Sequence, residues 1–353
     1  MPRVHTAVLI GRFQPFHLGH LALLEQALQA AQQVIVVLGS AHQARSPKNP
    51  FVWEERQQMI RASLPRASQG RVQFVPVRDY YDMQRWVEEV QRWVEALVPL
   101  GASVGLVGHH KDASSGYLRH FPGWHAIEQP RQGEVDATPL RAQYWNLDDR
   151  PKADVLASLA PSVPEATLQW LDDWMDTPAY AAVREEAQVL HAYRQSWAGA
   201  PFTPVFVTVD ALVVCAGHVL LVQRGRSPGK GLLALPGGFV EPDDTLEQSA
   251  RRELQEETGL VLEPAAWRAA LQGVEVFDHP GRSQRGRTIT HVYVLHLPGD
   301  TLPEVAGADD AAAADWVPLA ELSHLEPQFF EDHFHVLRRC FARFGGGPAP
   351  ALP

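Results

Sequence analysis

The chain has 353 residues and a formal net charge of -10, from 31 Lys and Arg against 41 Asp and Glu. At about 150 residues per domain this length predicts two domains, and 45% hydrophobic with 20% charged residues excludes global disorder. The negative charge offers no basic surface for bulk DNA or an anionic membrane, so neither nucleic acid nor membrane is expected as a partner. Only two cysteines, Cys215 and Cys340, occur and they lie far apart, which argues against a disulfide scaffold. No apolar run reaches the length of a signal peptide or a membrane span, so we expect a cytoplasmic protein.

The first part of the chain, residues 1–150, alternates short β-branched runs with longer amphipathic segments. We expect strands over 4–10, 34–38, 72–77 and 104–107, and helices over 18–32, 53–64 and 83–97. This alternation is typical of βαβ units and predicts an α/β domain with a parallel sheet.

The pattern changes twice in the rest of the chain. Residues 151–201 have helical spacing without strands, which predicts a helical connector. Residues 202–344 contain strand-like runs (VFVTVDALVV, HVLLVQR, THVYVLHL) and one acidic helical segment near 245–258, which predicts an α+β domain. The Gly- and Pro-rich end, 345–353, is expected to be a flexible tail.

A candidate phosphate site lies where the first strand runs through GRFQPFHLGH into the first helix. Such a junction presents free backbone N–H groups and the positive end of a helix dipole, which favour a phosphate. Gly11 and Gly19 allow close approach of the backbone, and Arg12 adds a permanent charge. His17 and His20 are three residues apart in the first turn, so both rings can point at one anion. The alternative is that the two histidines only cap the helix.

The segment GRFQPFHLGH resembles the signature of HxGH nucleotidyltransferases, and more closely that of the archaeal type of nicotinamide mononucleotide (NMN) adenylyltransferases. Further resemblances follow in NPFVWEER (49–56), GHHKDASSGYLRHFPGW (108–124) and DATPLR (136–141). In the last of these, Asp136 and Ala137 replace the usual small hydroxyl residue. The resemblance implies a Rossmann-like domain that joins ATP to NMN, giving NAD and pyrophosphate. The alternative is another HxGH transferase. The resemblance of NPFVWEER and of the segment 108–124 argues against it.

The resemblance also implies roles for individual residues. His17, His20 and Arg141 would act on the phosphates during transfer, and Mg²⁺ would accompany the ATP. The residues implied in substrate binding are Gly11, Arg12, Phe13, Arg56, Trp86, Asp112 and Thr138. For Trp86, a stacking partner for the cationic nicotinamide ring, the alternative is a core position shared with Trp93. For Asp112 the alternative is a helix cap, and the choice between NMN and its deamidated acid stays open.

A second candidate site lies in residues 238–260, GFVEPDDTLEQSARRELQEETGL. On a helix, Glu253, Glu256 and Glu257 span an arc of about 100°, so three carboxylates lie on one side. This concentration of charge is costly without cations, and Mg²⁺ or Mn²⁺ prefers such oxygen ligands. Gly259 is suited to end the helix. The apolar stripe expected to dock the helix consists of Leu246, Ala250 and Leu254. The alternative is a solvated acidic face.

This segment resembles the Nudix box, Gx5Ex7REUxEExGU, where U is apolar. Gly238 begins the match and Leu260 ends it, and Asp244 stands where the pattern has its first glutamate. We expect that position to support the loop, so the shorter side chain should cost stability more than activity. The resemblance implies metal-dependent cleavage of a nucleoside diphosphate, with Glu253, Glu256 and Glu257 as both the metal-binding and the catalytic residues.

Nearly the whole chain resembles bifunctional proteins that fuse an NMN adenylyltransferase to a Nudix hydrolase. The segments HPGRSQRGRTITH (279–291) and EPQFFEDHF (326–334) belong to this resemblance. It implies hydrolysis of ADP-ribose to AMP and ribose 5-phosphate. Arg282, Arg285 and Arg287 of the first segment could grip the substrate's phosphates, where the alternative is a solvated hairpin tip, and the resemblance implies Arg224 as a further substrate-binding residue. The general base stays open between Glu257, Glu326 and Glu331.

Two other functions remain for the C-terminal domain. It could act on a different nucleoside diphosphate, or it could sense ADP-ribose without cleaving it. Nudix-like sensors that control transcription carry a DNA-binding helical domain after the box. Only about ninety residues follow Leu260 here, without a basic recognition helix. The oligomeric state, including a homo-oligomer, also stays open.

Overall fold

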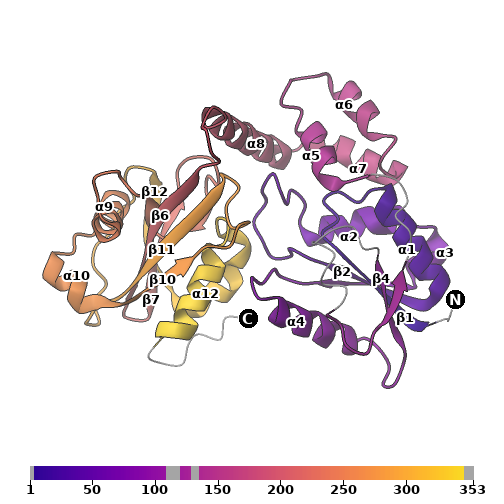
Figure 1. Cartoon of the computed structure of the whole chain (residues 1–353), viewed down its shortest axis with the longest axis horizontal. Coiled ribbons are helices and arrows are strands. Elements are labelled where there is room, and N and C mark those ends of the chain that lie inside the picture. The colour runs from indigo at the N-terminus through magenta and orange to yellow at the C-terminus, as the bar shows by residue number, and fades with distance from the viewer. Residues whose placement is uncertain (1–3, 109–119, 129–134, 346–353) are drawn as a thin grey trace. The chain divides into compact units, whose positions relative to one another are not determined.

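The computed structural model describes residues 4–108, 120–128 and 135–345, and it divides the chain into two compact units, Met1–Ala187 and Gln188–Pro353 (Figure 1). Each unit has its own sheet and its own hydrophobic cores. Among the described residues, no helix is both long and apolar enough to cross a membrane.

The sheet of the first unit has five parallel strands in the order β3-β2-β1-β4-β5. Their bounds are β1 (Val4–Gly11), β2 (Ala31–Leu38), β3 (Val72–Pro76), β4 (Val104–Gly108) and β5 (His125–Glu128). The first four strands match the predicted ones and confirm the parallel α/β fold. The fifth was not expected, because HAIE is short and has no apolar run. The carboxyl ends of all five strands meet at one edge, where ligands of such sheets bind.

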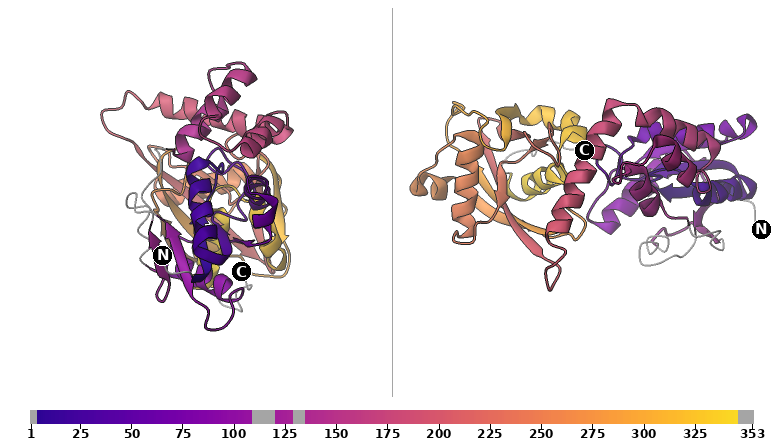
Figure 2. Two further views of the ribbon diagram at one scale, coloured as in Figure 1. Left: turned by 90° about the vertical axis from the view of Figure 1, so that its right-hand side faces the viewer. Right: turned by 90° about the horizontal axis from the view of Figure 1, so that it is seen from above.

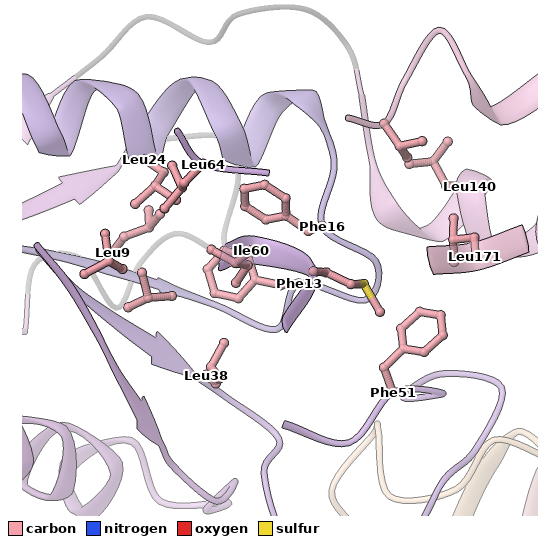
Figure 3. Packing of buried hydrophobic residues seen from close by; sticks show 14 of the residues in the cluster. Leu9, Phe13, Phe16, Leu24, Leu38, Phe51, Ile60, Leu64, Leu140 and Leu171 are labelled. Atoms are coloured by element: carbon pink, nitrogen blue, oxygen red, sulfur yellow. The ribbon is translucent and has the colours of Figure 1, made fainter. Parts of the chain in front are cut away.

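Helices cover both faces of this sheet, as parallel strands require. The helices are α1 (Leu18–Ala30), α2 (Trp53–Ala62), α3 (Arg66–Gln69), α4 (Met83–Glu95) and α5 (Ala137–Trp145). Leu9 of β1 lies in a core with Leu24 of α1 and Ile60 of α2 (Figure 3), whereas its neighbour Val8 lies in a second core with Val90 of α4. Helix α1 ends before the predicted residue 32 because Ala31 already pairs with Val4 in the sheet.

The segment 151–201 is helical, as expected, and forms α6 (Lys152–Leu159), α7 (Glu165–Met175) and α8 (Pro178–Ser196). Leu159, Leu171 and Val183 are buried in the same core as Leu24 and Ile60, and Figure 3 shows Leu171 beside Leu140 of α5. These helices therefore belong to the first unit as far as Ala187, and the rest of α8 belongs to the second unit.

The second unit contains a mixed sheet with the central order β10-β11-β6-β7-β12. Its strands are β6 (Val205–Cys215), β7 (His218–Arg224), β8 (Leu233–Ala234), β9 (Gly237–Phe239), β10 (Leu271–Phe277), β11 (Arg287–His296) and β12 (Ala311–Pro318). β6 and β11 are parallel, the other central pairs are antiparallel, β8 pairs with β7, and β9 pairs with β6. This mixed α+β arrangement confirms the predicted fold class of the C-terminal domain.

Two helices cover opposite faces of the mixed sheet. Leu220 of β7 lies in the core beneath α9 (Leu246–Thr258), and Leu221 lies in the core beneath α12 (His333–Phe344). This is the alternation expected of a strand buried on both sides. The right-hand view of Figure 2 shows the strands between orange helices on one side and the yellow α12 on the other. The smaller helices are α10 (Pro264–Ala270) and α11 (Leu322–Leu325).

Candidate functional sites

The predicted phosphate loop of the first unit runs from the end of β1 to the start of α1. Phe13 has a φ of 51°, in the left-handed region, and its ring packs against Gly11. A Cβ on Gly11 would come within 2.8 Å of that ring, so the loop requires glycine there. Phe13 is 1% exposed. The side chain of Phe13 therefore shapes the loop from inside, and the expected substrate contact of this residue stays a prediction.

His17 and His20 lie together at the start of α1. Their rings stack, with centroids 3.5 Å apart and an interplanar angle of 23°. His17 is the N-cap residue, and its backbone N–H points at Nδ1 of His20 over a long distance of 3.4 Å. The two proposed uses of the histidines thus coexist, since they cap the helix and also present two adjacent imidazoles. Whether both touch a phosphate stays a prediction.

Helix α5 brings the DATPLR segment to the same loop. Arg141 donates to the carbonyl oxygen of Gln14 at 2.7 Å and to Oγ1 of Thr138 at 3.1 Å. Burial lowers the pKa of Arg141 to about 10, and the nearby charge of Arg12 adds to this shift. Arg12 itself is exposed. Two segments more than 120 residues apart therefore bring two guanidinium groups and a hydroxyl to the loop that leads into the histidine pair.

Arg56, expected to contact a phosphate, has a different task. Its side chain is fully buried, and Nη1 donates to the carbonyl oxygens of Arg12 at 2.7 Å and Gly39 at 2.6 Å. Burial lowers its pKa to about 10. Because backbone carbonyls occupy the guanidinium, the phosphate-binding expectation is corrected: Arg56 ties the loop after β1 to the loop after β2.

Asp79, which the sequence analysis did not single out, also helps to hold these loops. Asp79, just after β3, accepts hydrogen bonds from the backbone N–H of Ser40 at 3.1 Å and from its Oγ at 2.6 Å. Arg56 also donates to the carbonyl oxygen of Ser40 at 3.3 Å. The only signal in the sequence was the position of Asp79 directly after a strand that ends at the ligand edge.

The two tryptophans of α4 have different environments. Trp86, in the first turn, is half-buried and lies edge-to-face with Phe121 at 6.1 Å, and Phe121 stacks on Trp124 at 4.6 Å. Trp93 is 42% exposed. The alternative of one shared core position is therefore wrong, and Trp86 belongs to an aromatic group at the start of α4. Asp112 lies outside the described residues.

In the second unit, α9 is built as expected from the box segment. Thr245 caps its start with a hydrogen bond to the N–H of Gln248, and Gly259 ends it with a φ of 70°. Ala250 and Leu254 are 1% exposed, which confirms the apolar stripe. Asp244 accepts from Oγ of Ser249 at 3.1 Å and from Nε of Arg252 at 3.3 Å, so the shorter side chain still ties the loop to the helix.

Two of the three glutamates lie against the glycines of β9. Oε2 of Glu257 accepts a hydrogen bond from the N–H of Gly237 at 2.9 Å. A Cβ on Gly238 would come within 2.6 Å of Oε1 of Glu253. Gly238 is thus required because a carboxylate occupies the space of the missing side chain, and Gly237 is required because a Cβ there would come within 2.2 Å of the carbonyl oxygen of Val209. Glu256 is farther out, with 44% of its side chain exposed.

The electrostatics of this site are those of crowded carboxylates. Burial raises the pKa of Glu257 to about 8, and the charges of Glu253 and Asp210 add to the shift. Burial also raises the pKa of Glu253. Asp210, which was not expected, is a buried residue of β6 that accepts from Oγ1 of Thr290 at 2.5 Å. These side chains offer only oxygen ligands, and the pKa values of their carboxyl groups are raised. Such a group suits a divalent cation, which would displace the protons on binding.

Arg252 neutralises two of the three glutamates in this structure. Its Nη1 lies 3.0 Å from Oε1 of Glu253 and 2.7 Å from Oε2 of Glu256. Within the described part of the chain, no three His, Cys, Asp or Glu side chains stand in an arrangement that could hold a metal ion. The metal-binding role of Glu253, Glu256 and Glu257 therefore stays a prediction, and it requires Arg252 to release two carboxylates.

The arginines expected to bind the hydrolase substrate separate into two groups. Arg282 makes two hydrogen bonds with the carboxylate of Asp332, at 2.9 and 3.0 Å, and both residues are buried. Nη1 of Arg287 donates to the carbonyl oxygen of Asp278. These guanidiniums hold the β10–β11 hairpin and its loop, and the substrate contacts implied for both arginines stay predictions. The guanidiniums of Arg224 and Arg285 instead lie over the ring of Phe330, at 4.3 and 6.0 Å.

The three candidates for the general base lie in different environments. Oε1 of Glu331 accepts from Oγ of Ser283 at 2.9 Å and from the N–H of Gln284 at 2.8 Å, so Glu331 holds the arginine-bearing loop. Glu326 is half-buried in a short helical turn. Of the three, Glu257 is the one inside the carboxylate group.

Comparison with known proteins agrees with this division into two sites. Residues 204–340 match the NUDIX domain family, and residues 8–97 match the Cytidylyltransferase-like family. A nicotinamide/nicotinic acid mononucleotide adenylyltransferase of Acinetobacter baylyi is 41% identical over 180 residues, which are 51% of this chain and 91% of the relative. An ADP-ribose pyrophosphatase of Methanocaldococcus jannaschii is 36% identical over 132 residues, 37% of this chain and 70% of the relative.

A solved structure joins the two halves. The crystal structure of a bifunctional NMN adenylyltransferase/ADP ribose pyrophosphatase from Francisella tularensis has a TM-score of 0.89 and 38% identity, and the match covers 97% of this chain and 100% of that chain. The chain belongs to this family of bifunctional enzymes. A second structure from Francisella tularensis, complexed with AMP and Mn ion, matches with a TM-score of 0.86 at 37% identity. Because one match spans both units, the family supports two enzymes of pyridine-nucleotide metabolism over a lone transferase with a sensor domain.

Proposed function

We propose that the first unit of this family member transfers the adenylyl group of ATP to NMN. A phosphate oxygen of NMN attacks the α-phosphorus of ATP, the bond to the β-phosphate oxygen breaks, and NAD and pyrophosphate leave. The attacking phosphate is already a nucleophile, so the protein has to supply alignment and positive charge. The stacked imidazoles of His17 and His20, with Arg12 and Arg141, offer this charge at one loop.

Trp86 is proposed as the face on which the nicotinamide ring stacks. It lies in the first turn of α4, which follows β3 at the carboxyl edge of the sheet. An aromatic face attracts a cationic pyridinium. Thr138 and Arg141 are proposed to hold the triphosphate end, since they are already joined at 3.1 Å.

We propose that the second unit hydrolyses ADP-ribose, with water, to AMP and ribose 5-phosphate. Glu253, Glu256 and Glu257 would hold Mg²⁺, with Mn²⁺ as a substitute. A cation held there would supply Lewis-acid activation of the diphosphate and of the attacking water. Glu257 keeps its place through a hydrogen bond from the N–H of Gly237. The observation that carries this proposal is the pair of carboxylates, Glu257 buried and Glu253 half-buried, that lie against the β9 glycines.

The two activities are proposed to be separable, because their residues belong to different units. The cytoplasm is the proposed compartment, in agreement with two buried, unbridged cysteines.

The test is product analysis of the purified chain with Mg²⁺. One reaction contains ATP with NMN, a parallel one contains ATP with nicotinic acid mononucleotide, and a third contains ADP-ribose. We expect a dinucleotide in at least one of the first two, and AMP with ribose 5-phosphate in the third. NAD without hydrolysis of ADP-ribose would overturn the proposed hydrolase substrate.

Paired variants assign the sites. His20→Ala should abolish dinucleotide synthesis and leave hydrolysis intact, and Glu257→Gln should do the reverse. His191→Ala and Glu304→Gln change exposed residues of the same types and serve as matched controls. Loss of both activities in one folded variant would contradict independent sites.

A further inference from the structure

Gln14 lies in the middle of the GRFQPFHLGH loop and is 1% exposed. Its side-chain Nε2 donates to the carbonyl oxygen of Phe51 at 2.9 Å, and its Oε1 accepts from the N–H of the same residue at 3.0 Å. One amide therefore bonds to both backbone polar groups of a buried residue that lies 37 positions later in the chain. This reciprocal pair joins the loop after β1 to the segment that leads into α2.

The backbone of Gln14 has a partner from a third segment. Nη1 of Arg141 donates to the carbonyl oxygen of Gln14 at 2.7 Å, and its Nη2 donates to Oγ1 of Thr138 at 3.1 Å. A guanidinium is planar and rigid, so two acceptors in different places fix the direction in which it points. Because the side chain of Gln14 is held by Phe51, the place of its carbonyl oxygen depends on that amide pair. The direction of Arg141 depends on it as well.

Phe51 is held in turn by the aromatic side chains of α7. Its ring lies edge-to-face with Trp170 at 5.0 Å and 88°, and with Trp174 at 4.9 Å and 72°. Phe51 is 2% exposed and shares its core with Leu171 of the same helix (Figure 3). Edge-to-face pairs of rings add a directional attraction to the burial of their surface. A helix that was expected to serve as a connector therefore fixes the residue on which Gln14 depends.

Helices α7 and α8 also hold the helix that carries Arg141. The hydroxyl of Tyr144 donates to the carbonyl oxygen of Leu171 at 2.8 Å, and the hydroxyl of Tyr180 donates to the carbonyl oxygen of Tyr144 at 3.0 Å. Tyr144 follows Arg141 by three residues, about one turn of α5. Both partners of the contact between Arg141 and Gln14 are thus supported from α7.

The start of α1 has a further contact with this helical segment. The N–H of Leu18, the first residue of α1, donates at 2.9 Å to the carbonyl oxygen of Ser162, which lies between α6 and α7. This N–H is one of the donors that a helix leaves without a partner at its own N-terminus. Leu18 directly follows His17, so the same segment fixes the place at which the histidine pair begins.

We propose that Gln14 is a positioning residue of the transferase, which sets the direction of Arg141 through its own attachment to Phe51, and that α7 supports it. The amide of Gln14 is buried and bonded to the backbone, so it acts on the reaction through Arg141 and not by touching ATP or NMN. The inference rests on the proposed transferase function. It adds to that function a support that lies outside residues 8–97, the segment that matches the Cytidylyltransferase-like family.

Steady-state dinucleotide synthesis by the full chain, with ATP varied and NMN saturating, tests this role. Gln14→Met keeps the length of the side chain and removes both hydrogen bonds. We expect kcat/KM for ATP to fall by about 10- to 100-fold, the order of loss for a displaced reacting group, with the KM for NMN within about threefold. Gln143→Met, an exposed glutamine of α5, is the matched control and should leave all constants unchanged. An unchanged kcat/KM for ATP in Gln14→Met would overturn the positioning role.

A pH profile separates positioning from a loss of folding. In Gln14→Glu, an ionised carboxylate would face the carbonyl oxygen of Phe51, whereas the protonated form can donate to that oxygen and accept from the N–H, as the amide does. Burial beside a carbonyl oxygen raises the pKa of such a carboxyl group. The activity of Gln14→Glu relative to wild type should therefore rise as pH falls from about 8 to about 6, and that of Gln14→Met should stay constant. Both ratios are measured where circular dichroism shows folded chains, and a constant ratio in both variants would overturn the role of the amide pair.

The support from α7 has its own measurement. Trp174→Leu should raise the KM for ATP by about threefold to tenfold, and Trp174→Phe should restore most of the affinity. This pair of variants carries the test where Gln14→Met does not fold. Trp93→Leu, an exposed tryptophan of α4, is the control. Combined with Gln14→Met, Trp174→Leu should add little, because its effect passes through Phe51 and Gln14. Full additivity of the two variants would overturn the role of α7.

Calorimetric binding of ATP in the absence of NMN separates the positioning role from the proposed reaction. Weaker binding of ATP by Gln14→Met, with no dinucleotide made by wild type, keeps the positioning of Arg141 and rejects the proposed reaction. Equal binding of ATP by both chains together with unchanged kinetic constants overturns the positioning role, even where wild type makes NAD.

Discussion

Replacing Glu257 by Gln should stabilise the metal-free hydrolase unit at alkaline pH. Glu257 is 6% exposed, and burial raises its pKa from 4.5 to about 8. The folded state therefore keeps a proton that the unfolded chain releases at lower pH. Since the folded state binds more protons between these two values, the free energy of unfolding falls as pH rises from about 4.5 to 8.

The size of the effect follows from the same shift. At about 1.4 kcal/mol per pKa unit, it corresponds to an upper limit of about 5 kcal/mol above pH 8. A glutamine carries no charge into the buried site, and its amide oxygen can still accept from the N–H of Gly237. We expect Glu257→Gln to gain about 2–4 kcal/mol at pH 9 and almost nothing at pH 4.5.

Hydrogen exchange of peptides from α9 and β9, measured in EDTA, reports this unit separately from the first. Protection should be corrected for intrinsic exchange at each pH. Glu256→Gln is the matched control, because 44% of that side chain is exposed and its neutralisation relieves little burial. Equal protection of wild type and Glu257→Gln at pH 9, or an equal gain in the control, would refute the reasoning.

Three further predictions concern arginine contacts. Arg56→Met should destabilise the first unit by about 2–4 kcal/mol in urea unfolding, because the carbonyl oxygens of Arg12 and Gly39 lose a buried donor; a change below about 0.5 kcal/mol would contradict this. Asp332→Asn should cost about 3 kcal/mol by leaving Arg282 buried without its counter-charge, which thermal unfolding can detect as a lower Tm of the second unit. Arg287→Ala should increase hydrogen exchange at the base of the β10–β11 hairpin, where unchanged exchange would contradict this contact, and a large increase in the KM for ADP-ribose would in addition make Arg287 a substrate contact.

The elements that could be predicted from the sequence are those with strong local patterns. The β-branched runs of β1 and β2, the apolar stripe of α9 and the stop at Gly259 depend on residues close together in the chain. β5 was not predicted, because its four residues, HAIE, form a strand only by pairing with β4.

The two site regions were also visible in the sequence, since each is a continuous motif. GRFQPFHLGH places both histidines in one helical turn, and the box segment places three glutamates on one side of α9. Local geometry fixes these spacings, so no tertiary information is needed to see that each group is concentrated.

Tertiary structure alone decided what each arginine does. The chain offers Arg56, Arg282, Arg285 and Arg287 as similar cations next to suitable motifs. Arg56 and Arg282 donate to partners from other segments, Arg287 donates across its own hairpin to Asp278, and Arg285 keeps an unbonded buried N–H. The same holds for the glycines of β9, since the space of a side chain on Gly238 is filled by Glu253 of α9 and that on Gly237 by Val209 and Asp210 of β6. A sequence determines the kind of group and its local spacing, whereas the role of a long polar side chain depends on which distant acceptors folding brings within about 3 Å.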